Sequence, residues 1–155
     1  MIKKFIDLGM QPLANKYLTK KDLFIKREDF YHLEVGYNTK TKLVSILNII
    51  PSKKMFDNKY PYRSSMSQTM LDSFQKLANY IKRKFKSNLI LEIGSNDGSF
   101  IKNFSKKEII CVEPCNNLAK ITKKMGYETF ANFWDIKLAK KIKSKKKSID
   151  LIYSA

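Results

Sequence analysis

The sequence is short of the residues on which several protein classes depend. Its 155 residues include two cysteines, one histidine and three arginines, and the cysteine spacing matches no disulfide framework. No stretch approaches the roughly 18 apolar residues of a membrane span. The basic N-terminus has only a short apolar patch and no small-residue cleavage site, so it does not resemble a signal peptide. We therefore expect a cytoplasmic protein with no membrane partner.

The cysteines and the histidine predict no metal site. Cys111 and Cys115 stand in Cys-Val-Glu-Pro-Cys, whereas zinc and redox sites typically use Cys-x-x-Cys. Free cysteine commonly behaves as a small buried hydrophobic residue, so we interpret both as ordinary thiols. One histidine cannot form a zinc site alone, and we expect His32 to be solvated or packed at an edge.

The scarcity of arginine weakens a nucleic-acid interpretation of the net charge. A formal charge of +17 would attract polyanions. However, 28 of the 31 basic residues are lysines, whereas base and phosphate recognition favours the planar fork of arginine. We expect a solvated, lysine-rich surface and no nucleic-acid partner.

Hydrophobic periodicity divides the chain into three parts. Residues 1–60 alternate short apolar, β-branched runs with polar turns, which predicts a small β-rich region. Residues 61–87 begin as a loop and continue with apolar side chains at three- and four-residue intervals, which predicts a helix capped by Ser67. Residues 88–155 alternate short apolar strands with helices, which predicts a parallel, doubly wound sheet. The expected fold class is therefore α/β, with a partial Rossmann-like sheet after a β-rich N-terminal region.

The predicted elements follow these patterns. Strands are expected at 33–37, 42–50, 89–91, 109–112, 127–130 and 149–155. Helices are expected after Gly98, from Asn116 as a cap to Met125, and after Asp135 as a cap, with Ile136 among its inward residues. Gly126 is placed to end the second of these helices in a left-handed conformation.

A glycine turn after the apolar run 89–91 is the strongest chemical signal. It reads Glu92-Ile93-Gly94-Ser95-Asn96-Asp97-Gly98. Ligands of a doubly wound sheet bind beyond the carboxyl ends of its strands, where glycines let the backbone approach them. A nicotinamide fingerprint would need glycines in place of Asn96 and Ser99, which argues against a dehydrogenase.

Glu113 ends the next predicted strand, nineteen positions after Gly94. A carboxylate there can accept two hydrogen bonds from a ribose diol. With the glycine turn, it predicts a site for S-adenosylmethionine (AdoMet). The alternative is a tight strand-to-helix turn beside a solvated carboxylate.

Four further residues are candidates for the cofactor site. The side chains of Asn96 and Asp97 are short enough either to meet a bound amino-acid moiety or to cap a helix. Asn132 could hydrogen-bond an adenine edge, although a loop asparagine commonly forms turns. Ala155, at the end of the fourth predicted strand, would lie under the ligand.

The sequence also resembles the three-part sugar C-methyltransferases that act on nucleotide-linked deoxysugars. The resemblance extends over essentially the whole chain. It rests on residues 7–15 (DLGMQPLAN), 33–37 (LEVGY), 64–70 (SSMSQTM), 91–99 (LEIGSNDGS), 112–114 (VEP) and 150–153 (DLIY).

This resemblance implies a zinc-binding N-terminal subdomain, a central AdoMet-binding Rossmann-like domain and a C-terminal domain that helps to hold a nucleotide-sugar substrate. It implies the cofactor AdoMet and the transfer of a methyl group to a sugar carbon. Tyr62 resembles a family tyrosine that faces the active site and could contact the sugar or the enolate. Alternatively, Tyr62 is a loop residue packed on the helix that follows Ser67.

The chain departs from this family at both ends. Residues 38–42 read Asn-Thr-Lys-Thr-Lys where the family has Cys-x-x-Cys-Gly, so we expect no zinc site. The family's proton-abstracting histidine lies beyond the fourth strand, and the one histidine here is His32. C-methylation requires a base beside the carbonyl. We therefore expect a fragment that lacks the base and a C-terminal half, and binds AdoMet weakly without turnover. The alternatives are a methyltransferase of RNA or another polyanion, and a non-catalytic remnant that still binds AdoMet.

Overall fold

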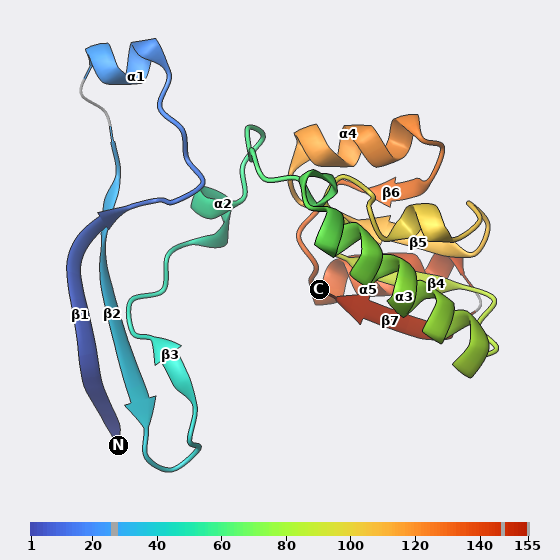
Figure 1. Ribbon diagram of the computed structural model, residues 1–155, viewed down its shortest axis with the longest axis horizontal. Helices are drawn as coiled ribbons and strands as arrows, with labels where there is room; N and C mark the ends of the chain where they lie inside the picture. The colour runs from blue at the N-terminus through green and yellow to red at the C-terminus, as the bar shows by residue number, and fades with distance from the viewer. Residues whose placement is uncertain (26–27, 147, 155) are drawn as a thin grey trace. The chain divides into compact units, whose positions relative to one another are not determined.

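The chain folds into two compact units, Met1–Phe56 and Asp57–Ala155, each with a sheet of its own (Figure 1). The computed structural model describes residues 1–25, 28–146 and 148–154. Within this described part of the chain, no helix is long and apolar enough to cross a membrane.

The Met1–Phe56 unit is a three-stranded antiparallel sheet in the order β1-β2-β3. Its elements are β1 (Ile2–Pro12), α1 (Lys20–Phe24), β2 (Phe30–Asn38), β3 (Val44–Ile46) and α2 (Ser52–Met55). Among the described residues of this unit, Gly36 is the one that is buried. A small sheet with so little apolar core gains little stability from hydrophobic burial.

The Asp57–Ala155 unit is a four-stranded parallel sheet in the order β6-β5-β4-β7 with helices packed on it. Its elements are η1 (Ser64–Met66), α3 (Gln68–Lys84), β4 (Ile90–Ile93), η2 (Ile101–Asn103), β5 (Ile109–Val112), α4 (Asn116–Lys124), β6 (Glu128–Phe130), α5 (Ile136–Lys145) and β7 (Leu151–Ser154). The predicted fold class, a partial Rossmann-like sheet after a β-rich N-terminal region, is confirmed.

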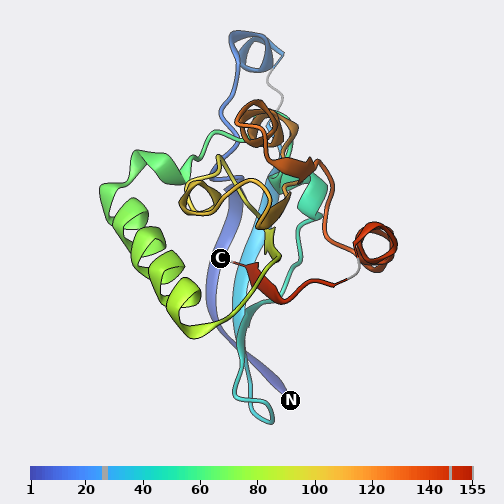
Figure 2. The same cartoon turned by 90° about the vertical axis from the view of Figure 1, so that its right-hand side faces the viewer.

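Alternate strand positions form two separate cores on the two faces of this sheet. One core joins Phe74, Ala78 and Ile81 of α3 to the inward residues of β4 and β5, including Ile90 and Cys111. The other joins Leu138 and Ile142 of α5 to Leu91, Ile110 and Val112. In Figure 2, α3 and α5 accordingly lie on opposite sides of the strands. The central strands β4 and β5 are covered on both faces, and they are mostly apolar, as is typical of parallel sheets.

Several local predictions are confirmed by the backbone. Ser67 caps α3 by accepting a hydrogen bond from the amide of Met70, and Asp135 caps α5 in the same way. Gly126 ends α4 with φ +88°. Cys111 and Cys115 are buried, unpaired thiols.

Three local predictions are wrong. The glycine turn leads into the short 3-10 turn η2, because the side-chain Nδ2 of Asn103 donates to the carbonyl of Phe100, 2.9 Å away, and closes the segment. Cys115, not Asn116, is the N-cap of α4. Ile136 is 74% exposed, since it is about half a helical turn away from the inward position of Leu138.

Candidate functional site

The loop after β4 is shaped by three residues with positive φ. Gly94 has φ +80°, Asn96 +49° and Gly98 +87°. A Cβ at Gly94 would meet no atom within 4 Å, whereas one at Gly98 would lie 3.2 Å from the side chains of Ile101 and Thr122. Gly98 is therefore required by both conformation and packing. Gly94 is required by conformation alone and leaves its backbone open to an approaching molecule.

The loops after β4, β5 and β6 meet at one edge of the sheet. The strand register pairs Ile93 with Val112, and Val112 with Phe130. The Gly94 amide donates to the carbonyl of Val112 at 2.8 Å, and the Glu113 amide donates to the carbonyl of Phe130 at 3.0 Å. The predicted site residues therefore share the carboxyl edge of the parallel strands, where ligands of such sheets bind.

Glu113 joins the end of β5 to the glycine loop. Its Oε2 accepts a hydrogen bond from the amide of Asn96 at 2.8 Å, and its Oε1 accepts one from the amide of Cys115 at 2.8 Å. The side chain is buried. Glu113 is therefore not the solvated strand-end carboxylate of the alternative interpretation. Each oxygen keeps a second lone pair that can accept a further donor.

Glu92 lies buried in β4, and its Oε2 has no hydrogen-bond partner in the described part of the chain. Burial and, to a lesser degree, the charge of Glu113 raise the pKa of Glu92 to about 8. The buried Oγ of Ser95 likewise has no hydrogen-bond partner there. Unsatisfied buried polar atoms are uncommon in native proteins and are concentrated where a ligand or strain is present.

Asn96 and Asp97 bind the preceding segment of the chain. The Asn96 Oδ1 accepts the amide of Ser64 at 3.0 Å, and the Asp97 Oδ2 accepts the amide of Ser65 at 3.2 Å. Burial alone would raise the pKa of Asp97, but its hydrogen bonds with Ser65 and Ser99 lower it below the ordinary value. The loop leads directly into the 3-10 turn η2 and not into an α-helix. The prediction that these two side chains cap a helix is therefore wrong.

Tyr62 lies beside the same loop. Its carbonyl accepts a hydrogen bond from the Asn96 Nδ2 at 3.3 Å, and its side chain is 45% exposed. The carbonyl of Tyr60 similarly accepts from the Asn117 Nδ2 at 2.8 Å. The segment from Tyr60 to Ser65 is therefore fastened to the candidate site through backbone atoms.

The remaining candidates lie farther along the chain. Asn132 follows β6 by two residues and is exposed. Ala155 lies outside the described residues. The predictions had not included the backbone amides of Ser64 and Ser65, although both serines belong to the 64–70 stretch on which the family resemblance rests.

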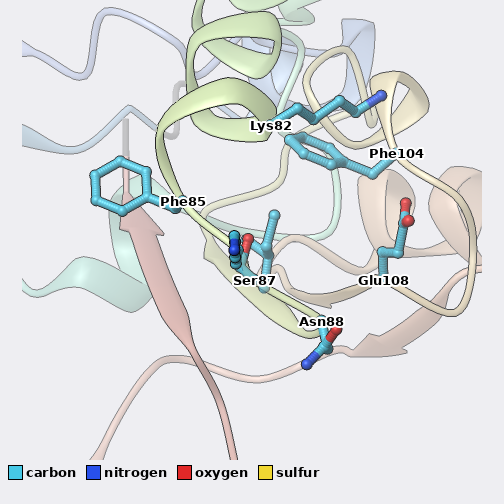
Figure 3. Close-up of a pocket in the computed structure, with 8 residues that line it drawn as sticks. Lys82, Phe85, Ser87, Asn88, Phe104 and Glu108 are labelled. Carbon is cyan, nitrogen blue, oxygen red and sulfur yellow. The ribbon is translucent and has the colours of Figure 1, made fainter.

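The hollow of Figure 3 lies at the other end of the strands. It has a volume of about 370 Å³, and Ile90 and Glu108, at the amino ends of β4 and β5, are among its lining residues. The Lys82 ammonium lies 5.2 Å from the ring centre of Phe104 and also donates to a backbone carbonyl. A smaller hollow of about 160 Å³ has Asp97, Gly98 and Ser99 among its lining residues, together with Arg63 and Lys102. Only the smaller one touches the glycine loop, so the larger is not the predicted cofactor site.

Comparison with protein-family models gives a match to the first unit. Residues 1–56 match the family model "Methyltransf_13: Putative zinc binding domain". The match has the bounds of the Met1–Phe56 unit and is consistent with the N-terminal region of a methyltransferase. No curated protein matches the chain.

Proposed function

We propose that the Asp57–Ala155 unit binds S-adenosylmethionine and serves a methyltransferase that methylates a carbon of a nucleotide-linked deoxysugar. The observation that carries the cofactor proposal is the hydrogen bond from the Asn96 amide to Glu113. It holds a buried carboxylate against a glycine loop at the carboxyl edge of a parallel sheet. The match of residues 1–56 to a methyltransferase-related family supports the reaction class.

The residues present fit the parts of this cofactor. Glu113 has lone pairs left for the two ribose hydroxyls. The backbone at Gly94 is open to close approach, and the unsatisfied Glu92 Oε2 offers an acceptor near that loop. We assign the amino-acid moiety to the loop from Ser95 to Asp97, and the adenine edge to Asn132.

The charge of the site also suits a cationic cofactor. The carboxyl groups of Asp97 and Glu113 lie there beside Glu92, which its raised pKa keeps mainly neutral at pH 7, although the chain carries 14 acidic residues against 31 basic ones. AdoMet carries a sulfonium and an ammonium group, both of which a carboxylate-rich site attracts. The same carboxylates would repel a phosphorylated nucleotide cofactor.

Within this proposal, Tyr62 contacts the sugar or the enolate that forms from it. Bound AdoMet supplies an electrophilic methyl group. The substrate carbon must first lose a proton to a base, and we assign that base to none of the described residues. The nucleotide-sugar specificity rests on the family resemblance alone.

The zinc named in the family description does not fit the first unit as a cysteine-ligated structural site. Residues 1–56 contain no cysteine and one histidine, whereas structural zinc sites use four ligands that are mostly cysteine and histidine. We therefore route no step of the proposed function through zinc.

Calorimetric titration with S-adenosylhomocysteine tests the proposal, because this product analogue probes the site without turnover. We expect saturable binding that weakens by about 1–3 kcal/mol in Glu113→Gln, or roughly 5- to 150-fold in Kd. Glu108→Gln is the matched control, because Glu108 comes directly before β5, whereas Glu113 comes directly after it. A folded wild-type chain that binds no S-adenosylhomocysteine would contradict the proposal, as would equal affinity in the two variants.

A further inference from the structure

Two carboxylates lie directly opposite each other in the β1–β2 ladder of the Met1–Phe56 unit. The register pairs Asp7 with Glu34, between two irregularities at Lys4/Ile6 and at Asp7/Met10. The first irregularity brings Lys4 and Asp7 to the same side of the strand, although residues three apart on a regular strand face opposite ways. The second contains Gly9, whose φ of +66° suits glycine.

Like charges directly opposite each other destabilise a strand pair, and here Lys4 supplies the compensating charge. The Lys4 Nζ lies 2.9 Å from the Asp7 Oδ2 and 2.6 Å from the Glu34 Oε1. These contacts hold the pKa of Lys4 well above its usual range and, with other hydrogen bonds, lower the pKa values of both carboxyls. One ammonium therefore bridges β1 and β2.

The remaining carboxylate oxygens have other partners. The His32 Nε2 lies 2.8 Å from the Asp7 Oδ1, which also accepts the amide of Gly9 at 3.0 Å. The Asn48 Nδ2 donates to the Glu34 Oε2 at 2.7 Å, which ties the chain beyond β3 to the cluster. His32 is partly exposed at this sheet surface.

The same cluster has the make-up of a metal site. Asp7, His32 and Glu34 each offer one ligand atom, and these atoms lie within 4.8 Å of one another. Their residue types are ones that bind zinc. However, the Lys4 ammonium is bonded to both carboxylates, and a second cation at the same oxygens would be repelled. The cluster thus holds a cation already, in a unit whose family description names zinc.

We propose that the Lys4 ammonium takes the place of a metal ion in this unit. It is the resident cation that joins β1 to β2 through Asp7 and Glu34, and the unit folds without zinc. Small domains with small cores commonly depend on metals, disulfides or other cross-links, and the Lys4–Glu34 ion pair is a cross-link between β1 and β2. The proposal is independent of the AdoMet site, which belongs to the other unit.

Metal analysis of the full chain is the first test. We expect protein produced in zinc-supplemented medium and purified without chelator to carry fewer than about 0.1 zinc ions per chain, far below the one-to-one ratio of a structural site. EDTA should leave the backbone amide NMR signals of Gly9, His32 and Gly36 unchanged. A stoichiometric zinc ion, or displacement of these signals by EDTA, would overturn the proposal.

Replacing Lys4 tests its role directly. Lys4→Ala removes the resident cation and should shift the Gly9 and His32 signals, and added Zn²⁺ should then bind at about one equivalent through the freed ligands. Lys3→Ala is the matched control, because it removes the same charge from the neighbouring position of β1. Adding His32→Ala to the Lys4→Ala variant should abolish the gained zinc binding. If Lys4→Ala and Lys3→Ala have the same Gly9 and His32 signals, Lys4 does not join the strands. If Lys4→Ala does not fold, the zinc content of the wild-type chain still tests whether the unit folds without zinc.

Discussion

The negative charge of the Glu113 carboxylate helps to keep the nearby carboxyl group of Glu92 protonated. Burial is the larger cause, and the Glu113 charge is the smaller one, of the rise in the pKa of Glu92 to about 8. The Oε2 of Glu92 also has no hydrogen-bond partner among the residues that the structure describes. The pair therefore combines one carboxyl that is neutral at pH 7 with a second that is fixed by two backbone amides.

The raised pKa of Glu92 makes stability fall as the pH rises. The folded chain keeps a proton on Glu92 that the unfolded chain releases above its ordinary pKa of 4.5. The unfolding free energy should therefore decline between about pH 4.5 and pH 8, by roughly 2–5 kcal/mol from this group. Urea denaturation at pH 5 and pH 8 measures the decline.

Glu92→Gln should remove most of this pH dependence, because a neutral amide of similar shape has no proton to release. Glu128→Gln is the control, since Glu128 is exposed and should leave the slope between pH 5 and pH 8 unchanged. Equal slopes in wild type and Glu92→Gln would show that Glu92 is not the titrating group.

Gly94 and Gly98 should respond differently to alanine. Both have positive φ, so each substitution should cost about 1–2 kcal/mol in backbone strain. At Gly98 the added methyl also crowds Ile101 and Thr122, and overpacking of this kind costs about 1–3 kcal/mol more. We expect thermal denaturation to give a lower melting temperature for Gly98→Ala than for Gly94→Ala. The opposite ranking would contradict the packing of this loop.

Gly94→Ala should instead affect ligand binding. Its new methyl would project into open space at the carboxyl edge, where we propose the cofactor lies. S-adenosylhomocysteine should bind at least about tenfold more weakly, equivalent to about 1.4 kcal/mol. Unchanged affinity in a folded Gly94→Ala chain would place the ligand elsewhere.

The sequence predicted the parts of the fold that depend on local patterns. Ser67 and Asp135 were identified as caps because a side-chain oxygen three residues before an unpaired amide acts locally. The central strands of the parallel sheet were identified because burial on both faces gives short apolar runs such as 89–91 and 109–112. The convergence of the glycine loop and Glu113 followed from the rule that parallel strands end at one edge.

Long-range packing decided what the sequence did not predict. Phe100 is buried against Phe74, Phe104 and Tyr153, and this cluster, with the side-chain hydrogen bond of Asn103, favours a 3-10 turn over the predicted helix. In β1, two irregularities disrupt the period-two pattern, so the Lys4, Asp7 and Glu34 cluster cannot be read from spacing. The Ser64 and Ser65 contacts join segments 32 positions apart.

The two helix caps offer a local test of the parallel-sheet unit. Ser67→Ala and Asp135→Ala each remove the acceptor of an otherwise unpaired amide, that of Met70 and that of Leu138 respectively. Each should lower the unfolding free energy by about 0.5–2 kcal/mol. Ser144→Ala is the control, because Ser144 lies near the end of α5 and caps no amide there. If Ser67→Ala and Asp135→Ala lower the unfolding free energy no more than this control does, the two side chains do not stabilise their helices as caps.

Asp97 should hold the Ser64–Met66 turn to the glycine loop. Asp97→Ala removes the acceptor for the Ser65 amide and the Ser99 hydroxyl, so the unfolding free energy should fall by about 1–3 kcal/mol. Amide hydrogen exchange at Ser65 should become faster, whereas Asp72→Ala, at an exposed position of α3, should leave it unchanged. Because the folded pKa of Asp97 is below its ordinary value of 3.8, its stabilisation is present above that pH and is lost as the pH falls through the folded pKa. Wild-type exchange at Ser65 in the Asp97→Ala chain would contradict this role and leave the turn held by Asn96 alone.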